Sequence, residues 1–462
     1  MQNAEQASPL AENKMGTMPI GRLLASMAIP MMISMMVQAF YNVVDSVFVA
    51  RVSENALNAV SLAFPLQNLT IAVGIGTAVG MNAMLSRSLG EKNQEMVDKA
   101  ANTGIFLSLC SFVVFAIIGL TLSRAFFLAQ TDVMEIVDYG TDYATICLAC
   151  SLGLFCQLCF ERLLQSTGRT GLAMVTQLVG AVINIIFDPI LIFGLFGFPR
   201  MEVAGAAIAT VAGQTVGAIL AIIINVCHNH EIHIRPKMIR WNGAIASEIY
   251  RVGLPSIVMQ SISSVMTFGI NQILIAFSTT ATAVFGAYFK LQSFVFMPVF
   301  GLNNAMVPII SYNYGAVKPD RVKKTVRLSV IAATCIMIVG AAVFELFPTP
   351  LLRFFDASEH MLEIGVPALR IIAVHFVLAG FCIVAGSVCQ AIGNPFYSLI
   401  VSVCRQLVVL LPVAWILSRF GRLELVWLAF PIAELMSLLM STIFLRRTMV
   451  SAEKAMQQRM AQ

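Results

Sequence analysis

Twelve long apolar segments, joined by short polar connections, constrain this chain more than any other feature of its sequence. A helix needs about 20 mostly apolar residues to cross the hydrocarbon layer of a bilayer, and a barrel strand needs only about 10. The sequence therefore predicts an all-α polytopic membrane protein whose twelve spans cover residues 20–47, 57–83, 101–123, 138–160, 171–195, 203–227, 245–275, 281–307, 328–348, 361–388, 396–418 and 425–445.

The composition supports this interpretation. Hydrophobic residues make up 58% of the 462 residues and charged residues only 11%, too few to coat a soluble protein of this length. The net charge of +5 comes from basic residues in the short connections. We interpret these residues as topology signals rather than as a nucleic-acid surface.

The distribution of Lys and Arg predicts the orientation in the membrane. If the N-terminus is cytoplasmic, 19 of the 29 basic residues lie in cytoplasmic segments and 6 in external ones. We therefore expect a multi-pass protein of the cell (plasma or inner) membrane with both termini in the cytoplasm. The predicted units are a cytoplasmic N-terminal segment, a first six-helix bundle, a cytoplasmic linker, a second six-helix bundle and a cytoplasmic tail, at residues 1–19, 20–227, 228–244, 245–448 and 449–462.

The two halves of the sequence match in one constant register. Prolines, glycines and glutamines keep this register, in the pairs Pro30–Pro255, Gly76–Gly301, Gly90–Gly315, Gln165–Gln390 and Gly168–Gly393. Because six is an even number of spans, the second unit enters the membrane from the same side as the first, so the bundles are parallel repeats. Transporters built in this way bind substrate between the repeats, which favours a transporter over a channel or a receptor.

Charged and polar residues inside the spans are the candidates for chemistry, because charge in the hydrocarbon layer is costly. Asp45 lies late in the first span, Asn184 and Asp188 lie one turn apart late in the fifth, and Thr210 lies early in the sixth. The topology places all four in the outer half, where they can converge. Two carboxylates in one poorly hydrated pocket repel each other, which suits uptake of H+ or, with amide and hydroxyl oxygens, of Na+. The alternative is that each acid bonds to a neighbouring helix.

Other in-span residues have two interpretations each. Lys290 faces a cavity, or it snorkels or pairs internally; Glu434 is a second titrating group, or a bonded structural acid. Arg370, Arg405 and His375 are expected to join helices, and the repeat-related Gln67 and Gln292 to share a packing role. Together the candidates for the substrate cavity are Gln38, Tyr41, Gln67, Lys290, Gln292 and Glu434, and Pro30 is the candidate for helix bending.

Signatures of soluble enzymes are missing from the sequence. It contains no G-x4-G-K-[ST] phosphate loop and no H-E-x-x-H motif, so we expect neither an enzyme nor a cofactor. Cys147, Cys150, Cys156 and Cys159 have a zinc-like spacing, but they lie in CLACSLGLFCQLC, which predicts one uninterrupted apolar helix. A structural zinc site needs ligands folded around the metal, so we interpret these cysteines as packing residues.

Several motifs resemble the multidrug and toxic compound extrusion (MATE) family over roughly residues 18–448. They are IPMMISMMVQAFYNVVDSVFVAR, SRSLGEKN, LLQSTGRT, INIIFDPILIFG and EVAGAAIAT in the first half, and FMPVFGLNNAMVPIISYNYGA and QAIGNP in the second. The resemblance implies a twelve-helix antiporter that expels amphipathic, often cationic compounds by alternating access, driven by H+ or Na+. No nucleic acid and no obligate protein partner are implied.

Within the family, the chain is similar to the DinF-like branch, close to its MepA-like members. That similarity implies that Asp45, Asn184, Asp188 and Thr210 form a first-half cation site, which would hold Na+ if the protein is sodium-coupled. The NorM-like branch carries acids in helices seven and ten, which are absent from the corresponding apolar stretches here, so no second-half cation site is implied. Two alternatives remain: a lipid-linked substrate flippase of related architecture, and a non-transporting membrane sensor.

Overall fold

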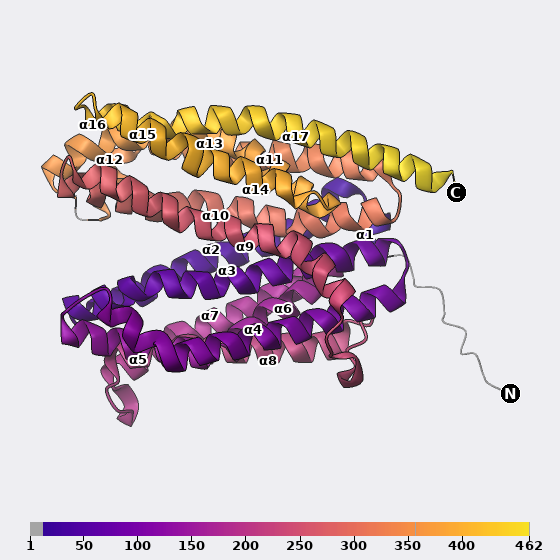
Figure 1. The fold of residues 1–462 in the computed structure, drawn as a ribbon, viewed down its shortest axis with the longest axis horizontal. Helices are drawn as coiled ribbons and strands as arrows, with labels where there is room; N and C mark the ends of the chain where they lie inside the picture. Colours follow the sequence, from indigo (N-terminus) through magenta and orange to yellow (C-terminus); the bar gives the residue numbers. More distant parts are fainter. Residues whose placement is uncertain (1–12, 356, 462) are drawn as a thin grey trace.

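Long helices running along one common direction make up the protein (Figure 1). The computed structural model describes residues 13–355 and 357–461, so the first twelve residues of the predicted N-terminal segment lie outside the described chain. The first half contains α1 (Lys14–Thr17), α2 (Ile20–Ala50), α3 (Glu54–Gly90), α4 (Gln94–Leu128), α5 (Met134–Ala149), α6 (Leu152–Ser166), α7 (Thr170–Phe193), η1 (Leu195–Gly197) and α8 (Glu202–His228). After η2 (Pro236–Met238), the second half contains α9 (Gly243–Ile275), α10 (Thr279–Gly315), α11 (Pro319–Leu346), α12 (Pro348–Arg353), α13 (Glu359–Ile392), α14 (Pro395–Val403), η3 (Cys404–Leu410), α15 (Leu411–Ser418), α16 (Leu423–Trp427) and α17 (Ala429–Met460).

The number of membrane crossings agrees with the prediction, although one crossing is broken. Among the described residues, eleven helical segments are long and apolar enough to span a membrane, and α5 with α6 forms a twelfth that is bent by 45°. The expectation of one uninterrupted helix through the four cysteines is therefore wrong. The break lies at Cys150 and Ser151. Gly153, the second residue of α6, packs closely on α8, because an added Cβ there would lie 2.9 Å from the Thr215 backbone. No cluster of three metal-ligating side chains occurs among the described residues.

The two halves repeat each other in local detail. Ser53 and Ser278, which the repeat register pairs, cap α3 and α10 by accepting a hydrogen bond from the backbone three residues later, each at 3.0 Å. Gly168 and Gly393 end α6 and α13 with positive φ angles of 81° and 99°, a conformation that glycine adopts without steric cost. The repeated glycine in the sequence therefore has a backbone reason.

Side-chain contacts inside each bundle follow the same register. The Ser86 hydroxyl on α3 donates to the Ser166 carbonyl at 3.2 Å, and the Ser311 hydroxyl on α10 donates to the Ala391 carbonyl at 2.9 Å. The two donors are repeat-related, and so are the two acceptors. Figure 1 shows the first-half helices on one side of the molecule and most of the second-half helices on the other.

The two bundles touch through pseudo-symmetric close crossings. A Cβ on Gly90 of α3 would lie 2.0 Å from the Tyr312 carbonyl oxygen of α10, and a Cβ on Gly315 would lie 2.2 Å from the Arg87 carbonyl oxygen. On the crossing of α3 with α9, a Cβ on Gly80 would lie 2.1 Å from the Ile249 carbonyl oxygen. Gly90 and Gly315 are the last residues of α3 and α10. Their neighbours contact both ends of the described chain, since Asn313 Nδ2 donates to the Met15 carbonyl at 3.0 Å and Arg459 of α17 lies 3.3 Å from Glu91. The bundles are therefore closed against each other at that end.

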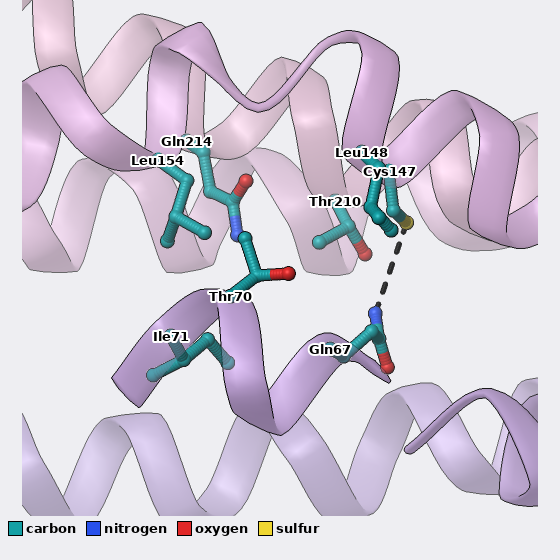
Figure 2. A pocket seen from close by; sticks show the side chains of 8 residues that line it. All are labelled: Gln67, Thr70, Ile71, Cys147, Leu148, Leu154, Thr210 and Gln214. Atoms are coloured by element: carbon teal, nitrogen blue, oxygen red, sulfur yellow. Dashed lines mark hydrogen bonds between the residues drawn. The ribbon is translucent and has the colours of Figure 1, made fainter. Parts of the chain in front are cut away.

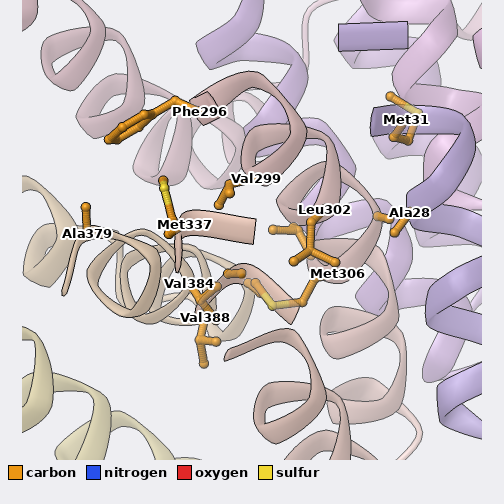
Figure 3. Packing of buried hydrophobic residues seen from close by; sticks show 14 of the residues in the cluster. Ala28, Met31, Phe296, Val299, Leu302, Met306, Met337, Ala379, Val384 and Val388 are labelled. Carbon is orange, nitrogen blue, oxygen red and sulfur yellow. The ribbon is translucent and has the colours of Figure 1, made fainter. Parts of the chain in front are cut away.

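An apolar core fills the second bundle and continues toward α2. Figure 3 shows Phe296, Val299, Leu302 and Met306 of α10 beside Met337 of α11 and Ala379, Val384 and Val388 of α13, with Ala28 and Met31 of α2 nearby. Such interdigitated packing supplies most of the cohesion between helices in a membrane, where burial from water is not available.

The short helix α1 and the residues on either side of it contact both bundles. Asn13 Nδ2 donates to the Thr167 carbonyl at 3.1 Å and to the Glu231 carboxylate at 2.8 and 2.9 Å, on the side of the first bundle. On the side of the second bundle, Arg321 Nη2 donates to the carbonyls of Met15 and Met18 at 2.9 and 2.7 Å. At the other terminus, α17 continues to Met460, so the predicted tail is the end of the last helix through that residue.

Candidate cation and substrate site

Asp188 is the centre of the candidate site. Its side chain is 0% exposed on α7, and neither of its carboxylate oxygens has a hydrogen-bond partner within the described chain. The carboxyl of Asp45 on α2 lies within hydrogen-bonding reach of it, and Asp45 Oδ1 is also buried without a partner. Two ionised carboxylates only accept hydrogen bonds, so this pair needs a proton or a metal cation between its oxygens. Chemically, such a pair can accept a proton or a metal cation.

The two other residues expected at this site lie beside the carboxyl pair. Asn184, one turn before Asp188 on α7, donates from Nδ2 to Thr210 Oγ1 of α8 at 3.2 Å. Asn184 Oδ1 is buried and has no partner within the described chain. The structure thus brings Asp45, Asn184, Asp188 and Thr210 together from three helices. Carboxylate, amide and hydroxyl oxygens are ligands that suit hard cations.

Glu161, buried on α6 in the same bundle, is a further acid that was not among the residues predicted from the sequence. Its carboxylate accepts hydrogen bonds from Gln157 Nε2 at 3.0 Å, Thr176 Oγ1 at 3.1 Å and Gln177 Nε2 at 2.6 Å. Gln177 also contacts Ser34 of α2, so this network joins α2, α6 and α7. Glu161 is one residue beyond the predicted end of the fourth span at 160, and a longer span would have revealed it as an acid in the membrane.

A partly open cavity adjoins the cation site through Thr210. Its free volume, counted for the centres of water-sized molecules, is about 30 Å³. Figure 2 shows the residues that line it, which are Gln67, Thr70, Ile71, Cys147, Leu148, Leu154, Thr210 and Gln214. Gln67 Nε2 donates to the Tyr143 hydroxyl at 3.1 Å and lies near Cys147 Sγ, the contact drawn in Figure 2. Gln67 therefore both packs against α5 and faces the cavity.

Gln38 and Tyr41 lie one turn apart on α2, before Asp45. Pro30 lies inside α2, and the helix continues through it from Ile20 to Ala50. These candidates are thus on the helix that carries one of the two acids.

The remaining candidates lie in the second bundle, away from the carboxyl pair. Lys290 is exposed on α10, and Gln292 is half-buried two residues further on. Glu434 on α17 is buried and accepts a hydrogen bond from Arg405 at 3.1 Å. Arg370 Nε donates to the Glu345 carbonyl at 3.3 Å, and His375 Nδ1 contacts the Ile372 carbonyl at 2.5 Å.

Two six-helix repeats around buried polar side chains define a membrane transporter of the repeat-built kind. The sequence profile of the MatE family matches this chain twice, over residues 30–190 and 255–416, which is the register of the internal repeat. The chain belongs to the MatE family, whose members are transporters and not enzymes.

Named relatives cover almost the whole chain. A protein named FAD transporter from Shewanella oneidensis is 26% identical over 433 residues, which are 90% of this chain and 92% of the relative. The multidrug export protein MepA of Staphylococcus haemolyticus is 25% identical over 440 residues, covering 94% and 96% of the two chains. A solved structure described as the outward-facing conformation of a multidrug resistance MATE family transporter superposes with a TM-score of 0.91 at 25% identity, covering 97% of this chain and 100% of that one.

Proposed function

We propose that this protein is a secondary active efflux antiporter, which exports amphipathic and often cationic small molecules in exchange for H+ or Na+. The observation that carries the proposal is the buried carboxyl pair of Asp45 and Asp188, three of whose oxygens have no partner among the described residues. Asn184 and Thr210 complete the proposed cation site. The likeness to a protein named as a multidrug exporter supports the substrate class.

The proposed mechanism is alternating access, with residues 20–227 and 245–448 as the two moving bundles and both termini in the cytoplasm. The contacts near Gly80 and Gly90 close the bundles at the end that carries the termini, so we assign this structure to an outward-facing state. In this state the acid pair binds the external cation, which neutralises the pocket and favours outward release of the drug. Each state must discriminate between cation and drug, because coupling arises only from such differential affinity. Bending of α2 at Pro30 would let the pocket change shape as its charge changes.

Transport by the purified full-length protein in proteoliposomes tests this proposal. Na+ and pH gradients are imposed independently, and uptake of several cationic dyes is recorded for the wild type and for Asp45→Asn and Asp188→Asn. We expect one of the two gradients to drive transport in the wild type and both substitutions to reduce gradient-driven transport at least about tenfold. An amide takes up no proton at neutral pH and lacks the negative charge with which a carboxylate holds Na+.

Asp132→Asn is the matched control, because Asp132 is an exposed acid in the connection between α4 and α5. It should transport like the wild type. Full gradient-driven transport by both site variants would remove the carboxyl pair from coupling. A parallel assay with FAD separates the two kinds of cargo, since one relative is named as an FAD transporter. Transport of a lipid-linked substrate with no dye transport would favour the flippase alternative.

A further inference from the structure

The segments that lead into α2 and α9 each lie against the opposite bundle. Residues 13–19 lead into α2 of the first bundle, and residues 229–242 lead into α9 of the second; we call them the N-terminal arm and the linker arm. The register that pairs Pro30 with Pro255 also pairs residue 13 with residue 238, and the start of α4 with the start of α11. The two arms are therefore related by the internal repeat.

Backbone carbonyls anchor the N-terminal arm to the second bundle. The Met15 carbonyl accepts hydrogen bonds from Asn313 Nδ2 of α10 at 3.0 Å and from Arg321 Nη2 of α11 at 2.9 Å. The Gly16 carbonyl accepts from Lys318 Nζ at 3.0 Å. Arg321 Nε also donates to Asn313 Oδ1 at 2.9 Å, which fixes the two donors relative to each other. Because hydrogen bonds from charged donors are stronger than neutral ones, we expect this arm to move with the second bundle.

Buried side chains of α4 anchor the linker arm to the first bundle. The His233 N–H donates to Asp98 Oδ1 at 3.0 Å, and the His233 carbonyl accepts from Asn102 Nδ2 at 3.0 Å. The Arg235 N–H donates to Asn102 Oδ1, again at 3.0 Å. Asp98 and Asn102 are both buried, so breaking these hydrogen bonds would leave buried polar groups without partners. The linker arm is therefore a part of the first bundle.

The two arms meet at the Asn13 side chain. Asn13 Nδ2 lies 2.8 and 2.9 Å from the two carboxylate oxygens of Glu231 in the linker arm and 3.1 Å from the Thr167 carbonyl after α6. Within the described chain, the side-chain hydrogen bonds from the N-terminal arm to the first bundle all start at this nitrogen. An amide nitrogen carries two hydrogens, so at most two of the three contacts are made at once.

We propose that the two arms form a latch at the end that carries the termini, and that the latch opens between Asn13 and Glu231. The N-terminal arm then stays on α10 and α11, and the linker arm stays on α4, when the bundles separate at that end. Asn13 is consequently a gating residue that touches neither the cation site nor the cavity beside it. The inference rests on the alternating access of the proposed function.

Cross-linking of the two arms tests where the latch opens. In full-length protein without native cysteines, Asn13→Cys and Glu231→Cys are joined by a short, reducible bis-methanethiosulfonate reagent, and dye transport is measured in proteoliposomes. Cross-linking should slow transport at least about tenfold, because the bundles can no longer separate at that end, and a reductant should restore it. The matched control joins Gln94→Cys to His233→Cys, whose native side chains lie 3.3 Å apart between α4 and the linker arm. Its cross-link should leave transport unchanged.

An exchange of donor and acceptor tests the same contact without a cross-link. Asn13→Asp keeps the oxygen that caps α1 but places a carboxylate against Glu231. It should lengthen the distance between spin labels at Glu95 on α4 and Lys324 on α11. Adding Glu231→Gln returns an amide donor to the contact and should shorten the distance again, whereas Thr17→Ala, an exposed position of α1, should have no effect.

The possible results separate this inference from the proposed function. Full transport by the cross-linked Asn13 and Glu231 positions would overturn the latch, and so would equal distances in the wild type and Asn13→Asp. Loss of transport on cross-linking the control positions would also overturn it, because the linker arm would then have to leave α4. Absence of dye transport by the wild type in both ion gradients would overturn the proposed function, and the distance measurements would still decide whether the contact holds the bundles together.

Discussion

A single methyl group at Gly80 should destabilise the state in which the bundles close at the end carrying the termini. The Cβ of Gly80→Ala would lie 2.1 Å from the Ile249 oxygen, 2.9 Å from the Ile249 carbonyl carbon and 3.2 Å from the Gly253 nitrogen, all backbone atoms of α9. A carbon–oxygen contact is normally about 3.3 Å, so the two helices must separate by roughly 1 Å. Overpacking of this kind costs about 1–3 kcal/mol, which lowers the population of the closed state about 5- to 150-fold.

Double electron–electron resonance measures this closure as the distance between two spin labels. The labels are attached at Glu95 on α4 and Lys324 on α11, which are both exposed. In a background without native cysteines, Gly80→Ala should shift the distance distribution toward longer values and slow dye export. Gly286→Ala on α10 is the matched control, because an added Cβ there meets no atom within 4 Å. Unchanged distances and unchanged export in Gly80→Ala would refute the argument that backbone contact at this glycine holds the bundles together.

Two further predictions concern the residues that hold α1 and its flanking residues in place. Arg321→Ala removes charged hydrogen bonds to the carbonyls of Met15 and Met18 and should lower the free energy of unfolding by about 1.5–3 kcal/mol. Lys324→Ala, which changes an exposed residue of the same helix, should have little effect. Thermal unfolding in detergent measures both variants. Burial raises the pKa of Glu231 above its ordinary value of 4.5, so this carboxyl stabilises the fold at pH values below 4.5 and this contribution is lost as the pH rises through the raised pKa. The melting temperature of the wild type should therefore fall as the pH rises through this window, and Glu231→Gln should reduce that fall. The same pH profile in both proteins would contradict the stabilising role of Glu231.

Much of the fold could be predicted from the sequence, because membrane insertion depends on local chain properties. The length of an apolar segment decides whether it crosses the bilayer, and an even number of spans decides that the repeats are parallel. The acids Asp45 and Asp188 were recognisable for the same reason, since a charge in hydrocarbon is costly wherever its neighbours lie. The glycines that recur in both halves indicated shared architecture, and the structure supplies their causes: the positive φ of Gly168 and Gly393, and the bundle contacts of Gly90 and Gly315.

Only the tertiary structure decided which buried side chains are neighbours. Whether Glu434 titrates or pairs was open in the sequence, and the rotation and packing of η3 against α17 bring Arg405 to it. No proline predicts the break between α5 and α6 in the sequence, and the structure shows that Gly153, just after the break, packs closely on α8. Glu161 gained its three donors from side chains that converge on it from α6 and α7. Hydropathy specifies that a segment enters the membrane, whereas helix rotation and depth, which depend on every neighbour at once, specify what its polar residues meet there.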